Sequence, residues 1–133
     1  MLYYQLLVDT PSLALSFDAK SQWLYAEWKG EHDTASIVAG CAAIRQCLAK
    51  TSCRKVLADS SQAVISWDEA AEWLGKNYFE VIARQGVRYL AWVCSSDLES
   101  HAWAKLALQH ARQPTIALFY ETTSADVWLR AQA

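Results

Sequence analysis

Small hydroxyl and carboxylate side chains follow three apolar runs in the second half of the chain, and they are the first candidates for chemistry. Asp59-Ser60-Ser61 follows residues 55–58, Ser95-Ser96-Asp97 follows 89–94, and Glu121-Thr122-Thr123 follows 115–120. Apolar runs of this length, separated by helical patterns, indicate buried parallel strands. Ligands of open α/β sheets bind where the strands end, and helix N-termini at that edge favour anions. Ser, Thr and Asp are also common in caps and turns, so the clusters mark a location rather than a reaction.

The remaining reactive side chains form no recognised catalytic or metal-binding pattern. The three histidines show no HxxH or HExxH spacing, and the four cysteines contain no CxxC pair. No Gly-x-Ser-x-Gly elbow occurs, and four glycines are too few for a glycine-rich phosphate loop. A dyad of Cys94 with a histidine stays open, although packing is the simpler role for a cysteine that ends a buried strand. We therefore expect no catalytic residue, no metal and no cofactor, and we do not expect an enzyme.

Charge and hydropathy argue against nucleic-acid binding and against a membrane span. The net charge is −2 and no basic block occurs, so nucleic-acid binding has little electrostatic support. No run reaches the roughly 18 apolar residues that a membrane helix needs, and the N-terminus does not resemble a signal peptide. We expect a cytoplasmic protein with four free thiols, of which Cys41 and Cys94 are buried.

Tryptophan is frequent, with seven residues in a chain of 133. Trp73, Tyr78, Phe79 and Trp103 lie on two expected helices, at positions that cannot all face a sheet. A monomer would then expose an apolar patch of roughly several hundred Å², the scale that usually marks an interface. We therefore predict a homodimer through these rings. The alternative is a monomer in which the rings close over a groove that binds a small apolar or lipid-like ligand.

The hydrophobic pattern predicts one α/β domain, residues 1–133, that positions these candidates. Residues 12–17 and 22–29 alternate as in an antiparallel hairpin, and residues 2–8 can add a further strand. We expect a mixed sheet in which 55–59, 89–94 and 115–120 are parallel inner strands and the 12–29 hairpin lies toward one edge. Helices are expected over 34–50, 67–85, 97–111 and 124–131, with N-caps at Asp33, Ser66, Ser96 and Thr123 and a C′ glycine at Gly86. The second helix should bury a stripe of Ala70, Leu74, Tyr78 and Val81.

The order of these elements and three short motifs resemble a known family. The motifs are Lys55-Val56-Leu57-Ala58-Asp59, Tyr78-Phe79 ahead of Gly86, and Leu90-Ala91-Trp92-Val93. Over residues 12–131 the chain resembles STAS-like domains of the anti-sigma-factor-antagonist (SpoIIAA-like) superfamily, and in particular a bacterial group of short, stand-alone, uncharacterised members.

The resemblance implies a non-catalytic regulatory module that works through protein–protein contact. Switch members of that family carry a phosphorylated serine at the helix start after this strand, and the matching position here is Ser66. Asp68 and Glu69 beside it would repel a phosphate. The related group is also similar to lipid-transfer domains, which keeps the apolar-ligand alternative open. The candidate ligand or interaction residues are Asp59, Ser60, Ser61, Ser66, Trp67, Trp73, Tyr78, Ser95, Ser96 and Trp103.

Overall fold

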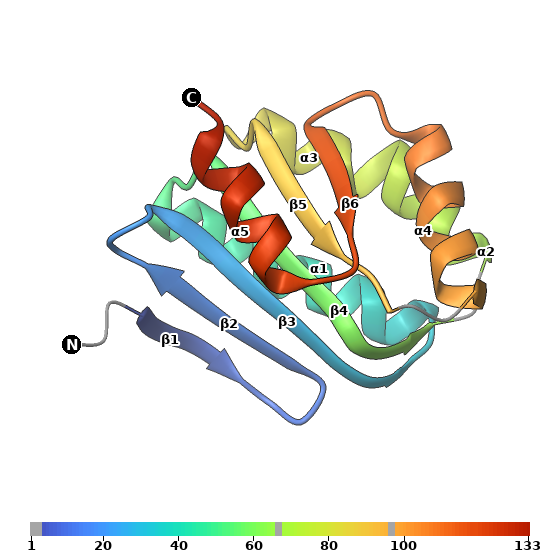
Figure 1. Cartoon of the computed structure of the whole chain (residues 1–133). Helices are drawn as coiled ribbons and strands as arrows, with labels where there is room; N and C mark the ends of the chain where they lie inside the picture. Colours follow the sequence, from blue (N-terminus) through green and yellow to red (C-terminus); the bar gives the residue numbers. More distant parts are fainter. Residues whose placement is uncertain (1–3, 66–67, 96–97) are drawn as a thin grey trace.

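A single mixed sheet organises the chain, in a computed structural model that describes residues 4–65, 68–95 and 98–133 (Figure 1). Its strands follow one another across the sheet in sequence order. The first three strands pair antiparallel, and the pairings from the third to the sixth are parallel. These strands are β1 (Tyr4–Asp9), β2 (Leu13–Asp18), β3 (Trp23–His32), β4 (Lys55–Ile65), β5 (Tyr89–Val93) and β6 (Thr115–Phe119).

Helices cover the two faces of the sheet unequally. The helix-rich face carries α1 (Thr34–Thr51), the helical run α2 (Asp68–Trp73), η1 (Leu74–Tyr78) and α3 (Phe79–Arg84), and α4 (Leu98–His110). The opposite face, here called the α5 face, carries α5 (Thr122–Ala131), which packs on β4 and β5. In Figure 1 α5 lies in front of the sheet, and no described helix covers β1 and β2 on that side. Half of the α5 face is therefore open.

The predicted α/β class and the mixed sheet are confirmed, with one error in strand position. Residues 13–18 and 23–32 form the expected antiparallel pair, and β1 adds the outermost strand on that side. Strands β4 and β5 are inner and parallel, as predicted. Strand β6 is an edge strand, so the prediction that 115–120 is inner is wrong. An apolar run reports how far the faces of a strand are shielded and not how many strands flank it, and Ile116–Phe119 of β6 are half-buried at the edge of the sheet.

The predicted second helix contains a π-turn that the periodicity did not reveal. At η1 the backbone N–H of Phe79 donates to the carbonyl of Leu74, a five-residue step. The wider turn shifts the buried stripe by one residue, so Ile82 is buried and Val81 is half-buried. The predicted stripe through Val81 is therefore wrong at its last position.

The helix caps agree with the prediction at two ends. Asp33 caps α1 in a capping box with Ser36, and Gly86 adopts a φ of +112° after α3, where only glycine is comfortable. The predicted cap Thr123 is wrong, because α5 begins at Thr122, two residues before the predicted start, and Glu121 is its N-cap. The predicted caps Ser66 and Ser96 lie outside the described residues.

Candidate functional site

Strand β4 does not end at Asp59, as the apolar run suggested, but continues to Ile65. Its pairing with β5 stops at Asp59 opposite Val93, while its pairing with β3 goes on as far as Ile65. Between these two parts the register with β3 shifts, with two β4 residues after Asp59 facing Trp28. Such a bulge redirects side chains. The cluster Asp59-Ser60-Ser61 therefore sits inside a long strand, at the point where its neighbour ends.

Asp59 points to the α5 face and is held by donors from three elements. Its Oδ1 accepts the backbone N–H of Ser61 at 2.9 Å and the Ser61 hydroxyl at 2.6 Å. Its Oδ2 accepts the hydroxyls of Tyr25 at 3.3 Å and Thr122 at 3.4 Å. The carboxylate is 6% exposed. The carboxylate thus accepts four hydrogen bonds, one of them from a backbone N–H two residues further along β4.

Tyr25 is a site residue that sequence reasoning missed. Its ring lies on β3, 34 residues from Asp59, so no local spacing connects the two. Burial, and then the Asp59 carboxylate, raise the pKa of the Tyr25 phenol well above its usual range. The phenol therefore stays protonated and serves Asp59 as a neutral donor.

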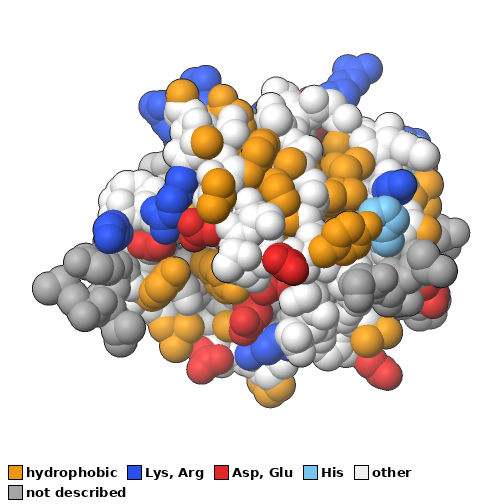
Figure 2. Space-filling view, viewed as in Figure 1, with side chains coloured by type: hydrophobic (Ala, Val, Ile, Leu, Met, Phe, Trp, Pro, Cys, Tyr) orange, Lys and Arg blue, Asp and Glu red, His pale blue; other side chains and the backbone are white. Residues whose placement is uncertain are grey.

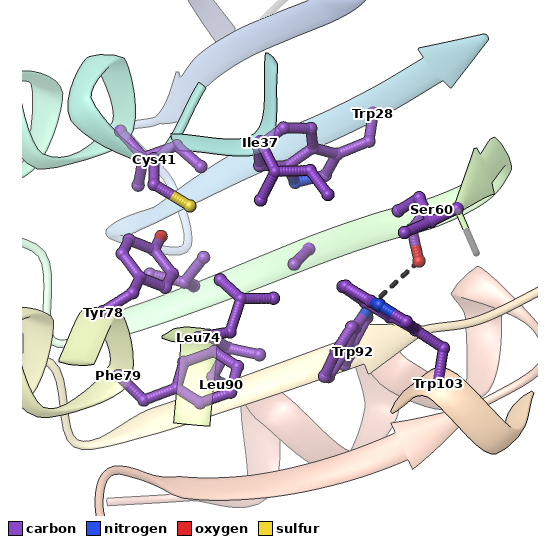
Figure 3. A pocket seen from close by; sticks show the side chains of 14 residues that line it. Trp28, Ile37, Cys41, Ser60, Leu74, Tyr78, Phe79, Leu90, Trp92 and Trp103 are labelled. Carbon is purple, nitrogen blue, oxygen red and sulfur yellow. Dashed lines mark hydrogen bonds between the residues drawn. The ribbon is translucent and has the colours of Figure 1, made fainter. Parts of the chain in front are cut away.

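Ser60 points to the opposite, helix-rich face and joins two strands. Its hydroxyl donates to the Val93 carbonyl at 2.9 Å and accepts the indole N–H of Trp92 at 2.9 Å (Figure 3). Ser60 and Trp92 are 9% and 6% exposed, so both bonds are made away from bulk water. Ser60 thus satisfies the last carbonyl of β5 and the polar atom of a buried indole.

A small cavity lies beneath Ser60, between the sheet and the helices of the helix-rich face. Its volume is about 40 Å³. A cavity of this size holds one or two water molecules, whereas small-molecule pockets measure roughly 300–1,000 Å³. Figure 3 shows rings and aliphatic side chains from both layers around it. The lining residues are Trp28, Ile37, Cys41, Ile44, Val56, Ala58, Ser60, Ile65, Leu74, Tyr78, Phe79, Leu90, Trp92 and Trp103.

The aromatic rings predicted to form a dimer surface lie mostly inside the protein. Tyr78, Phe79 and Trp103 are between 3% and 6% exposed, and Trp73 is half-buried with its ring stacked on Tyr78. Three of the four rings are thus buried rather than exposed, because α4 packs against η1 and its Trp103 ring reaches Trp92 on the sheet. These buried rings therefore cannot form the predicted dimer surface.

Close packing of η1 on α4 explains how the rings are enclosed. A Cβ on Gly75 would lie 2.3 Å from the Ala107 carbonyl oxygen and 2.5 Å from the His110 Cβ. Only glycine permits this approach, because real Cβ contacts are never so short. Trp103 reaches the cavity from α4, and its ring meets that of Trp92 edge-on at 5.6 Å.

All four cysteines are free and buried, which confirms the predicted burial of Cys41 and Cys94. Burial raises the pKa of the Cys94 thiol to about 12 and that of Cys41 beyond the usual range. Burial likewise raises the pKa of the Tyr78 phenol. These groups are protonated and poorly nucleophilic at neutral pH.

The structure divides the predicted site residues into four sets. Ser60, Tyr78 and Trp103 line the cavity, whereas Asp59 lies on the α5 face. Ser61, Trp73 and Ser95 are half-buried. Ser66, Trp67 and Ser96 lie outside the described residues. The seven candidates that the structure describes therefore do not form one site.

The open half of the α5 face carries exposed apolar side chains that sequence reasoning did not select. Tyr4 and Leu6 on β1 are 54% and 59% exposed. The Tyr4 ring meets Tyr25 edge-on at 6.4 Å, so the patch adjoins Asp59. Figure 2 shows hydrophobic side chains over β1 and β2 on this side. The alternation of apolar and polar residues over 4–6 could have indicated this exposed patch, if the segment had been interpreted as an edge strand.

Within residues 4–65, 68–95 and 98–133, no three His, Cys, Asp or Glu side chains gather in a way that could hold a metal ion. Among the helices of that same part of the chain, none is both long and apolar enough to cross a bilayer.

Comparisons with known proteins identify the fold. No protein-family profile and no curated protein sequence matches the chain. Among solved structures, the unphosphorylated form of the anti-sigma factor antagonist SpoIIAA is similar, with a TM-score of 0.56 and 10% sequence identity over 98% of each chain. The resemblance inferred from the sequence is thus confirmed at the level of architecture: the chain has a STAS-like fold.

Proposed function

We propose that this chain is a single-domain, non-catalytic regulatory module that acts by binding another protein in the bacterial cytoplasm. The observation that carries the proposal is that the polar residues at the end of the β4–β5 pairing bind other groups of the same chain. Asp59 accepts four internal hydrogen bonds, and the Ser60 hydroxyl donates one and accepts one. Groups held in this way stabilise a scaffold and are poorly placed to attack a substrate.

The structural likeness supports the same proposal. SpoIIAA is described as an anti-sigma factor antagonist, a role defined by another protein, and its fold spans almost the whole of both chains. Buried, protonated thiols suit a reducing compartment. The ligand-binding alternative gains no support, because the cavity that the aromatic rings line is about 40 Å³ and far too small for a lipid.

Half-buried members of the predicted site are the residues that a protein partner can reach. Trp73 is one of them, and half-buried tryptophans often anchor interfaces. Trp128 on α5 has a similar degree of burial and provides a matched control. Loss of an anchoring ring typically weakens binding by more than about 1 kcal/mol.

Affinity capture followed by reconstitution tests the proposal. The immobilised chain is exposed to an extract of its source organism, and each retained protein is purified and titrated against the chain by calorimetry. We expect one protein to bind with fixed stoichiometry, and Trp73→Ala to weaken it more than Trp128→Ala does. If no retained protein binds once purified, the proposal fails. A small molecule retained in native mass spectrometry would instead revive the ligand alternative.

A further inference from the structure

We propose that the start of the parallel strands binds the phosphate group of a small molecule through two neighbouring arginines, Arg54 and Arg88. These residues precede β4 and β5, at the end of the sheet opposite the Asp59 cluster. We call this end the amino edge. The inference goes beyond the proposed binding of another protein and does not depend on it, because it uses none of the residues named there.

The first support is the placement of the two arginines side by side. The starts of β4, β5 and β6 form one row across the sheet, with Lys55 opposite Tyr89 and Tyr89 opposite Thr115. One residue ahead of this row, the backbone N–H of Arg88 donates to the Arg54 carbonyl at 2.7 Å. Adjacent strands lie about 4.8 Å apart, so the two charged residues occupy neighbouring positions. Like charges at such positions destabilise a sheet.

The second support is that the arginine pair lacks an internal partner. Both residues are exposed. In the part of the chain that the structure describes, neither side chain forms an ion pair. The carbonyls at the end of α3 already accept backbone N–H groups of residues 85–87, so they do not require Arg88 as a cap. An anion from outside the chain would relieve the repulsion between the two guanidinium groups.

The third support is a surface hollow beside Arg88. Its volume is about 380 Å³, within the range of roughly 300–1,000 Å³ that small-molecule sites show. Arg88, Gly86 and Thr115 are among the residues that line it, so a guanidinium and a hydroxyl face the same space. The Glu80 carboxylate accepts the amide N–H of Gln113, another lining residue, at 3.2 Å. The hollow thus has room for the organic part of a ligand whose charged group binds the arginines.

Charge gathers at the amino edge although the chain as a whole is slightly acidic. In the view of Figure 2, Lys and Arg side chains lie mainly in the upper half, where Figure 1 places the starts of β5 and β6. Asp and Glu side chains lie mainly in the lower half. The net charge of −2 is therefore spread unevenly, and the amino edge attracts anions.

The charge and shape of the arginine pair favour phosphate over other anions. A phosphate monoester carries about −1.5 to −2 charges at neutral pH, which matches two guanidinium groups, whereas a carboxylate carries one charge. Each guanidinium presents a planar fork of donors that fits two oxygens of a phosphate. The ligand class is therefore a small molecule with a phosphate monoester.

Titration of inorganic phosphate into the purified full chain, followed by two-dimensional proton–nitrogen NMR at constant ionic strength, tests the proposal. We expect saturable shifts of the backbone amides of residues 86–89 and of Thr115, with a dissociation constant of about 1 mM for so small an ion. Chloride at the same ionic strength should cause no saturable shift, because it cannot fill both forks.

Matched variants assign the binding to the arginine pair. Arg88→Gln and Arg54→Gln should each weaken phosphate binding by at least about tenfold, since each removes a charge-assisted pair of hydrogen bonds. Lys105→Gln removes an exposed charge from α4 and should leave the dissociation constant unchanged. In phosphate-free buffer, Arg88→Gln should melt no lower than the unsubstituted chain, because it removes a repulsive contact and no described ion pair.

Three results would overturn the proposal. Shifts that do not saturate by about 20 mM phosphate would mean that the amino edge has no such site. Equal weakening in the Lys105 and Arg88 variants would show a general effect of charge. A phosphate-free melt of Arg88→Gln well below that of the unsubstituted chain would make this arginine a structural residue. Failure to capture a protein partner would leave the titration unaffected.

Discussion

Removal of the Ser60 hydroxyl is the sharpest test of how the strand ends are used. In Ser60→Ala, the buried indole N–H of Trp92 and the Val93 carbonyl each lose a partner at 2.9 Å. An orphaned buried polar group costs about 1–3 kcal/mol. The two losses together should lower the free energy of unfolding by about 2–4 kcal/mol. For a domain of this size that corresponds to a fall in Tm of roughly 10 °C.

Urea denaturation followed by far-UV circular dichroism measures this change, and a double-mutant cycle assigns its cause. Trp92→Phe removes the indole N–H but keeps a ring in the core. In that background, Ser60→Ala leaves only the Val93 carbonyl without its partner. The double variant should therefore cost less than the sum of the single variants, by about 1 kcal/mol or more. Ser61→Ala is the neighbouring control. Ser61→Ala removes a hydroxyl that donates to the Asp59 carboxylate at 2.6 Å, but Asp59 keeps the backbone N–H of that position and no buried polar group loses its last partner, so the cost should be about 1–2 kcal/mol.

Two results would refute this reasoning. A loss below about 0.5 kcal/mol in Ser60→Ala would mean that water replaces the hydroxyl at no cost, as at an exposed site. Strict additivity in the cycle would mean that the Ser60–Trp92 bond contributes nothing of its own. In either case Ser60 would return to the set of residues available for binding a partner.

Three further predictions follow from the packing and the protonation states. Gly75→Ala should destabilise the protein by about 1–3 kcal/mol in urea melts, because the added Cβ would strike the backbone of α4. Asn77→Ala, on the exposed side of the same turn, should be near neutral. Equal effects of the two substitutions would contradict the close contact between η1 and α4. Asp59→Asn should cost on the order of 1–2 kcal/mol, since an amide keeps only part of the carboxylate's accepting capacity, and an unchanged thermal melt would rule out a structural role. Burial of the Cys94 thiol should make the free energy of unfolding depend on pH. Its contribution should be present in full below about pH 8.5, where a thiol of the unfolded chain begins to ionise, and should be lost as the pH rises toward about 12, the pKa of Cys94 in the folded protein. A free energy of unfolding that does not change across this window would show that the thiol is solvated.

The sequence was informative wherever a property depends on near neighbours in the chain. Apolar runs located β4, β5 and β6, alternation located the β2–β3 pair, and Asp33 and Gly86 marked the ends of two helices. Each of these signals comes from residues within one or two turns or strands, where spacing alone determines which face a side chain occupies. The α/β class and the resemblance to STAS-like domains followed from the order of those elements.

The candidate site was predicted less well, because its parts meet through distant pairings. Ser60 was selected as a strand-end hydroxyl, yet its partners Trp92 and Val93 lie more than 30 residues away and give it a structural role. Tyr25 was missed for the same reason. The aromatic rings of the two helices looked too numerous to face one sheet, but the close contact of Gly75 with α4 holds η1 and α4 together over the cavity, where Tyr78 and Trp103 are buried.

The amino-acid sequence by itself therefore determined which segments are strands and helices, the burial of Cys41 and Cys94, and the α/β order that a STAS-like fold requires. Only the tertiary structure decided that β6 and β1 are the edges of the sheet, that β4 runs past Asp59 to Ile65, and that one face is half open. The reason is physical. Periodicity reports whether a side chain is buried, whereas the identity of what buries it depends on strand order and helix packing between segments far apart in the chain.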